Sequence, residues 1–175
     1  FLVRQRSFSK TIRFSFFAKM NDFSLQNAIE VRRRAREKKE VFVLTNGCFD
    51  IIHAGHASSL NKASEFGDLL FVGLNSDQSV KQLKGSQRPI NSQENRAYLL
   101  SSLRAVDGVF LFDNQNLAAE ILMLEPDLYI KSEDYAYDTL NPEEREALKQ
   151  VGTKVDFVPL LKDISSSAII EKIMK

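Results

Sequence analysis

The chain has a single cysteine, Cys48, and its 175 residues contain no long uninterrupted run of apolar side chains. One cysteine cannot form an internal disulfide, which excludes the cross-linked framework of a small secreted protein and favours a reducing compartment such as the cytoplasm. Charged residues interrupt every apolar stretch well before the roughly 20 residues that cross a bilayer, so a membrane span is excluded. With 43% hydrophobic and 27% charged residues, the composition excludes disorder and collagen-like repeats and indicates a folded protein.

Acidic residues are missing from the first 19 positions, which carry five basic side chains. Subtracting these five from the 24 basic residues leaves 19 against 23 acidic ones, so the rest of the chain has a net charge of −4. A mildly acidic body disfavours a nucleic-acid-binding function. We interpret residues 1–19 as an extension outside the domain, either targeting-like or artefactual upstream sequence, and residues 20–175 as one domain.

Apolar runs of strand length alternate with helical patterns along this domain. Strands are expected at 41–44, 68–74, 109–112, 128–130 and 155–158, and helices at 24–39, 54–66, 91–103, 117–124, 142–151 and 166–174. The predicted fold is therefore α/β, a single Rossmann-like domain with about five mostly parallel strands and helices on both faces. The basic run at 32–39 is interleaved with glutamates and is expected to form a solvated helix face. The polar segment between the second strand and the next helix is expected to be a mobile loop. Function is expected at the carboxyl ends of the strands.

Both histidines of the chain, His53 and His56, follow the first expected strand at the beginning of a helical pattern. Three residues apart on a helix, their imidazoles can point at one small volume, and Gly55 between them leaves room for a ligand. The N-terminus of a helix attracts phosphate, so this arrangement favours a nucleoside triphosphate. A zinc site that adds Cys48 and Asp50 is disfavoured because four ligands within one loop are cramped and only one is a thiol. A hydrolase is disfavoured because Cys48 lacks the sequence context of a nucleophile.

The segment Thr45-Asn46-Gly47-Cys48-Phe49-Asp50-x-x-His53-x-Gly55-His56 resembles the HxGH nucleotidyltransferase superfamily, specifically its cytidylyltransferase-like branch. The resemblance extends over nearly everything after Met20. It continues through Asn75-Ser76-Asp77, Leu83-Lys84-Gly85, Arg88-Pro89-Ile90, Glu94-Asn95-Arg96, Pro126-Asp127-Leu128, Lys131, Asp134-Tyr135 and Ser165-Ser166-Ser167. Within the branch, the chain is most similar to bacterial adenylyltransferases that act on D-glycero-β-D-manno-heptose 1-phosphate, including those fused to a heptose kinase.

The resemblance implies that residues 20–175 form a nucleotidyltransferase domain that transfers AMP from ATP to a sugar 1-phosphate and releases pyrophosphate. It implies catalytic roles for His53, His56 and Lys84, and contacts with substrate phosphate for Lys84, Arg88 and Arg96. Nucleotide contacts are implied for Asn46, Gly47, Cys48, Phe49, Asp50, Gly55, Lys131, Asp134, Tyr135, Ser165, Ser166 and Ser167. The implied cofactor is Mg²⁺ bridging the phosphates, with Asp50 either orienting its loop or aiding the metal.

Two departures from the heptose enzymes leave the nucleotide and the acceptor open. Lys131-Ser132-Glu133 stands where those enzymes have Lys-Gly-Gly, and Ser165-Ser166-Ser167 stands in place of a Ser-Thr-Thr motif. One alternative is a CTP-dependent cytidylyltransferase acting on glycerol 3-phosphate or a similar alcohol phosphate. An alternative of another class is a non-catalytic nucleotide-binding module.

The expected partners of the domain are its nucleotide and sugar phosphate substrates. A separate sugar kinase is expected to supply the sugar 1-phosphate, because the chain carries no kinase domain. No nucleic acid or membrane partner is expected. Relatives often form homodimers, and the oligomeric state stays open.

Overall fold

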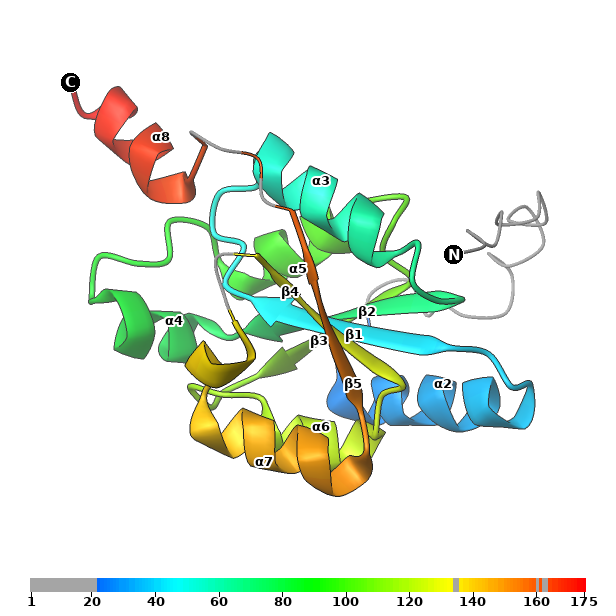
Figure 1. The fold of residues 1–175 in the computed structure, drawn as a ribbon. Coiled ribbons are helices and arrows are strands. Elements are labelled where there is room, and N and C mark those ends of the chain that lie inside the picture. Colours follow the sequence, from blue (N-terminus) through cyan, green and yellow to red (C-terminus); the bar gives the residue numbers. More distant parts are fainter. Residues whose placement is uncertain (1–21, 134–135, 160, 162–163) are drawn as a thin grey trace.

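A computed structural model describes residues 22–133, 136–159, 161 and 164–175 of the protein (Figure 1). The predicted extension at residues 1–19 and two predicted site residues, Asp134 and Tyr135, lie outside the described residues. Within the described part of the chain, no helix combines the length and the apolar character that crossing a membrane requires.

Strands and helices alternate as the sequence predicts. The strands are β1 (Phe42–Gly47), β2 (Leu69–Asn75), β3 (Gly108–Phe112), β4 (Leu128–Ser132) and β5 (Lys154–Val158). The helices are α2 (Leu25–Glu37), α3 (Ala54–Ala63), α4 (Asp77–Lys84), α5 (Gln93–Ser101), α6 (Ala118–Leu124), the 3-10 turn η1 (Tyr137–Thr139), α7 (Pro142–Val151) and α8 (Ser166–Ile173).

The five strands form one parallel sheet in the order β3-β2-β1-β4-β5, which confirms the predicted fold class. The chain adds β2 and β3 on one side of β1 and then crosses to the other side for β4 and β5. The boundary between β1 and β4 is therefore the topological switch point, where α/β sheets bind their ligands. The two strands pair only at Val43 with Leu128 and at Leu44 with Tyr129, although both continue further toward their carboxyl ends.

Helices cover both faces of the sheet (Figure 1). Helices α2, α6 and α7 pack on the face that presents Phe42 and Leu44, whereas α3 and α5 pack on the face that presents Val43 and Leu70. Because both faces of the sheet are buried, successive side chains of a central strand point alternately into two apolar cores, and neither set needs to be polar. This explains why the strands appear in the sequence as continuous apolar runs.

Two details of the predicted fold are wrong. The polar segment after β2 contains a helix, α4, whose N-cap Ser76 accepts a hydrogen bond from the Ser79 backbone N–H at 3.3 Å. Helix α5 begins at Gln93, two residues after the predicted start of the helix at 91, because its N-cap is Ser92. A short, mostly polar helix such as α4 shows little apolar periodicity, so the pattern after β2 resembles a loop.

The basic run at 32–39 is only partly the predicted solvated face. Arg33 and Arg34 pair with Glu30 on the exposed side of α2, as the spacing predicts. Arg32 instead is 5% exposed and binds both carboxylate oxygens of Asp127 at 2.8 and 3.1 Å. Asp127 also accepts the backbone N–H of Phe42 at 2.7 Å, so this ion pair ties α2 to the starts of β1 and β4.

Candidate active site

A cavity of about 620 Å³ opens at the carboxyl ends of β1, β2, β4 and β5. Most of the predicted site residues that the structure describes line it: Asn46, Gly47, Cys48, Phe49, Asp50, His53, Gly55, His56, Lys84, Lys131, Ser165, Ser166 and Ser167. Arg88 and Arg96 lie outside this lining. The switch point of the sheet and the cavity therefore coincide, as the fold class predicts.

The segment between β1 and α3, residues 48–53, is called the histidine loop here because it places both histidines at the N-terminus of α3. His53 is the N-cap of α3, and its ring nitrogen Nδ1 accepts the backbone N–H of His56 at 3.4 Å. The two imidazole rings stack with 3.8 Å between their centroids. A Cβ at Gly55 would lie 3.0 Å from the His53 ring and 3.2 Å from Ile164, so a side chain at this position would push against both residues.

Burial makes both imidazoles weak bases. Burial is the main cause that lowers the pKa of His56 to about 4, and the nearby His53 and Lys84 contribute less. Burial also lowers the pKa of His53. Both rings are therefore neutral at neutral pH. A hydrogen bond with the Ile51 backbone raises the pKa of His56, but by less than burial lowers it.

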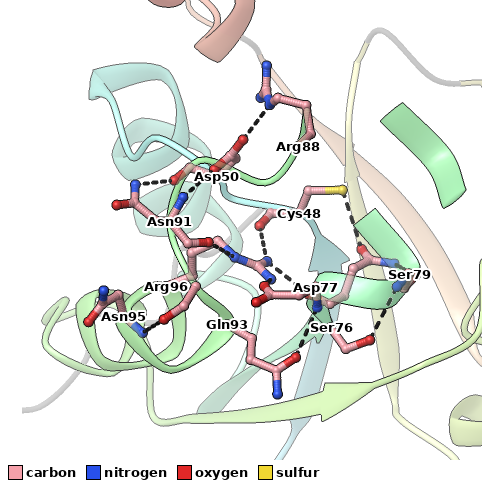
Figure 2. Close-up of polar contacts among 12 residues, drawn as sticks. Cys48, Asp50, Ser76, Asp77, Ser79, Arg88, Asn91, Gln93, Asn95 and Arg96 are labelled. Atoms are coloured by element: carbon pink, nitrogen blue, oxygen red, sulfur yellow. Dashed lines mark hydrogen bonds and ion pairs between the residues drawn. The ribbon is translucent and has the colours of Figure 1, made fainter. Parts of the chain in front are cut away.

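A buried carboxylate holds the segment after α4 against the histidine loop (Figure 2). The Asp50 side chain is fully buried and accepts hydrogen bonds from Arg88 Nε at 2.5 Å and from the backbone N–H groups of Ile90 and Asn91 at 2.7 and 3.1 Å. Burial alone would raise the pKa of Asp50, but the bonds from Asn91, Arg88 and Ile90 outweigh it and hold the pKa below its usual range. Asp50 is thus an ionised anchor between two loops.

Arg96 is a second buried anchor (Figure 2), and it is not among the residues that line the cavity. Its guanidinium is fully buried and donates to the carbonyl oxygens of Asn91, Cys48 and Asn75 at 2.6 to 3.0 Å. It also forms an ion pair with Asp77 at 2.8 Å. The structure therefore places Arg96 beneath the site, where it joins the histidine loop to β2 and to the start of α5, rather than with the residues predicted to contact substrate phosphate.

The remaining predicted residues approach the cavity from three elements. Ser165 caps α8 by accepting the backbone N–H of Ala168 at 3.1 Å, and the Ser166 hydroxyl donates to the Ile51 carbonyl at 3.0 Å. The start of α8 is thereby attached to the histidine loop. Lys84 is the last residue of α4, and Lys131 at the end of β4 donates to the side-chain oxygen of Asn46 at 2.6 Å.

The Cys48 thiol has a local structural role. It lies 3.8 Å from the side-chain oxygen of Asn75, and burial raises its pKa. A neutral thiol is a poor nucleophile, which agrees with the prediction that this is not a cysteine hydrolase. Among the described residues, no group of three His, Cys, Asp or Glu side chains lies close enough to hold a metal ion.

The cavity therefore brings together two helix N-termini, a pair of neutral imidazoles and two lysines, which is an arrangement that suits polyphosphate. Comparison with known proteins supports this interpretation. The sequence profile of cytidylyltransferase-like proteins matches residues 44–172, which include the histidine loop, the switch point and the start of α8. The chain belongs to the cytidylyltransferase-like family.

Other members and neighbours of this family give the comparison more detail. The chain is 40% identical over 158 residues to the bifunctional protein HldE of Geobacter sulfurreducens, and 48% identical over 144 residues to that of Wolinella succinogenes. These alignments cover 90% and 80% of the chain but only 31% and 28% of the relatives, so the chain spans about a third of their length.

A solved structure is similar as well. The crystal structure of the lipopolysaccharide core biosynthesis protein from Thermoplasma volcanium matches with a TM-score of 0.56 and 27% sequence identity. The match covers 71% of this chain and 99% of that protein. The shared fold therefore extends over nearly the whole of that neighbour.

The sequence of this family member did not point to two residues at the cavity edge. Glu144 lines the cavity and Tyr129 lies directly behind it, and both bond to Asn46. The sequence pattern shows Glu144 only as an acid in the first turn of a helix and Tyr129 only as part of a buried strand. One general signal was available: in a parallel α/β sheet, the first turns of the helices lie at the same edge as the carboxyl ends of the strands.

Proposed function

We propose that the protein is an adenylyltransferase that transfers AMP from ATP to D-glycero-β-D-manno-heptose 1-phosphate. One observation carries the proposal: the N-termini of α3 and α8, which bear His53, His56 and Ser165–Ser167, face one cavity together with Lys84. Two helix N-termini directed at one cavity provide backbone N–H groups and favourable dipoles for a triphosphate. The similarity to HldE and to a lipopolysaccharide core biosynthesis protein supports the sugar phosphate as the acceptor.

In the proposed reaction, a phosphate oxygen of the sugar 1-phosphate attacks the α-phosphorus of ATP. A new P–O bond forms, and the bond between the α-phosphorus and the oxygen that bridges it to the β-phosphorus breaks. The pair of electrons leaves with pyrophosphate, and the product is an ADP-sugar. Such a transfer needs positioning and charge neutralisation more than a covalent enzyme intermediate.

The chain's own residues have distinct tasks in this scheme. His53 and His56 donate hydrogen bonds to phosphate oxygens, and the Lys84 ammonium neutralises charge as it moves onto pyrophosphate. Ser165–Ser167 and the free N–H groups of α8 hold the terminal phosphates. Arg88, whose Nη2 atom is buried without a partner among the described residues, lies beside Asp50 at the border of the site and is proposed to reach substrate phosphate.

Magnesium is proposed to enter with the nucleotide. When bound, it neutralises phosphate charge and fixes the triphosphate geometry. Asp50 is a poor ligand for it here, because the carboxylate is fully buried and accepts three hydrogen bonds. The residues present therefore fit a Mg²⁺ ion that is held by nucleotide phosphates and water rather than by a protein cage.

A cytidylyltransferase acting on an alcohol phosphate is the second candidate. Ser132 lines the cavity at the end of β4, where the resemblance to the heptose enzymes leads us to expect a glycine. A side chain at this position alters the space for a nucleotide. The choice between ATP and CTP therefore needs a direct measurement.

The test is pyrophosphate release with ATP or CTP, each combined with heptose 1-phosphate, other sugar 1-phosphates and glycerol 3-phosphate. The proposal expects turnover with ATP and heptose 1-phosphate. Lys84→Ala and its matched control Lys81→Ala, an exposed lysine one turn earlier on α4, separate a role in the site from a general effect of charge. Turnover only with CTP and an alcohol phosphate would support the second candidate, and binding of nucleotide without any turnover would indicate a non-catalytic module.

We further propose that the enzyme works in the cytoplasm and receives its sugar 1-phosphate from a kinase reaction. The proposal follows from the chemistry of the acceptor, since a kinase reaction is the class of reaction that places a phosphate on a sugar. Co-incubation of the protein with heptose, ATP and a kinase that phosphorylates the anomeric hydroxyl should yield ADP-heptose and pyrophosphate only when both activities are present.

A further inference from the structure

Four side chains form a hydrogen-bonded network where β1 and β4 meet at the switch point. Three of them, Asn46, Lys131 and Glu144, line the cavity, and the fourth, Tyr129, is fully buried behind them. They come from β1, β4 and the first turn of α7, which are far apart in the sequence. The network therefore depends on the tertiary fold at the cavity edge.

The Asn46 amide is held in one orientation by this network. Its oxygen accepts from the Tyr129 hydroxyl at 2.8 Å and from the Lys131 ammonium at 2.6 Å. Its nitrogen donates to Glu144 Oε1 at 3.5 Å, which is a long hydrogen bond. A rotation of the amide by 180° would place the amide nitrogen against the Lys131 ammonium, and two donors would then face each other.

Glu144 fixes the network to the rest of the fold. It is 4% exposed, and its carboxylate accepts the backbone N–H of Leu117 at 2.9 Å and lies 3.1 Å from the Tyr129 hydroxyl, whose single hydrogen it shares with the nearer Asn46 oxygen. Leu117 is the N-cap of α6, so one carboxylate connects α6, α7 and β4. A buried carboxylate with specific donors cannot move without the loss of several bonds, which makes it a rigid support.

We propose that Tyr129 and Glu144 are positioning residues that hold the Asn46 amide so that it donates a hydrogen bond to an oxygen of the bound substrate. The amide oxygen has two donors already, whereas the amide nitrogen has a second hydrogen for the cavity that Asn46 lines. The Lys131 ammonium lies beside the Asn46 amide, so both groups offer hydrogen-bond donors to the cavity. Together they favour a hydroxyl or phosphate oxygen of the substrate and disfavour a group that can only donate a hydrogen bond. The inference rests on the proposed nucleotidyl transfer and adds the recognition of one substrate to it.

Tyr129→Phe is the main test, because it removes the hydroxyl and keeps the buried ring. The KM for ATP and the KM for heptose 1-phosphate are measured separately, together with kcat and the melting temperature. We expect one of the two KM values to rise by about tenfold, which corresponds to the loss of one oriented hydrogen bond, with little change in kcat. The substrate whose KM rises is the one that Asn46 contacts. Tyr98→Phe, at a tyrosine that is 59% exposed on α5, is the matched control and should change neither value.

A double-mutant cycle separates positioning from simple stability. If Tyr129 acts through Asn46, Tyr129→Phe should change the same KM by less than about twofold in an Asn46→Ala background. Glu144→Gln keeps an oxygen for the Leu117 and Asn46 donors and should restore most of the affinity that Glu144→Ala loses. Glu143→Gln, next to it on the exposed side of α7, controls for the loss of one negative charge.

Two results would overturn the inference. One is a Tyr129→Phe enzyme whose KM values both stay within about twofold of wild type while its melting temperature falls. The other is an equal loss in the presence and absence of Asn46. A wild-type enzyme without turnover on any substrate would count against the proposed function instead, and the affinity for Mg·ATP by calorimetry would then test the network with the same variants.

Discussion

The pKa of His56 can be tested through the stability of the protein, because the folded and unfolded states differ in their affinity for a proton. In the folded protein, burial lowers this pKa from 6.5 to about 4. The folded state therefore binds fewer protons than the unfolded state between these pH values, and the free energy of unfolding must fall as the pH decreases through this range. Above pH 6.5 the imidazole is neutral in both states, and no cost arises.

The size of the effect follows from the two pKa values. At pH 5.0 the difference between them corresponds to up to about 2 kcal/mol of lost stability, and the cost is nearly zero at pH 7.5. Carboxylates with lowered pKa values also lose stability at low pH, so the measurement needs a variant without this imidazole. His56→Asn removes the titrating group and should show a smaller loss of stability between pH 7.5 and pH 5.0, by about this amount.

Urea unfolding at the two pH values gives the difference directly. Proton NMR offers a second measurement, because the chain has only two histidines and the variant assigns both ring signals. We expect one imidazole to titrate near pH 4 in the free protein and to shift upward when a triphosphate binds, since nearby negative charge favours the protonated ring. An unchanged pH dependence in His56→Asn, together with two histidines that titrate near 6.5, would refute the assignment of a buried neutral pair.

Three further substitutions test the supports of the site. Arg96→Lys cannot make the four contacts of the buried guanidinium and should lower the free energy of unfolding by about 3 kcal/mol in urea titrations, whereas Arg33→Lys on the surface of α2 should cost less than about 0.5 kcal/mol. Gly55→Ala places a methyl group 3.0 Å from the His53 ring, so kcat should fall about tenfold while circular dichroism still shows a folded protein. Ser166→Ala removes the bond between α8 and the histidine loop and should raise the KM for ATP by about threefold to tenfold, and an unchanged KM would show that this bond does not position the site.

Much of the fold followed from local patterns in the sequence. The buried strands appeared as continuous apolar runs. Ser24 and Asn141, which cap α2 and α7 in the structure, are residue types that favour helix starts and can be recognised in the sequence. The histidine loop was found because both histidines of the chain lie within one short segment after a buried strand. These signals are local, so one sequence is enough to detect them.

The less accurate predictions concern residues whose partners are distant in the sequence. Arg96 lies in a helical pattern, and nothing in that pattern shows that its partners are the carbonyl groups of Cys48 and Asn75. The partner of Glu144 at the N-cap of α6 is likewise invisible in a first turn that resembles any acidic helix start. Tertiary contacts decide whether a charged side chain binds a ligand or supports the site, and spacing along the chain does not reveal them.

The motif residues of this family therefore divide into two groups with different expected phenotypes. His53 and His56 line the cavity, and their imidazoles are proposed to contact the substrate phosphates. Asp50 and Arg96 are buried, charged and fully engaged, and together they join the histidine loop to β2, to the start of α5 and to the segment that carries Arg88. The segment that leads from β1 to the N-cap His53 has no regular secondary structure, so its backbone needs such ties to hold the start of α3, and with it both imidazoles, in place. Substitution of a support should thus lower stability and kcat together, whereas substitution of a ligand-facing imidazole should lower kcat and leave the fold intact.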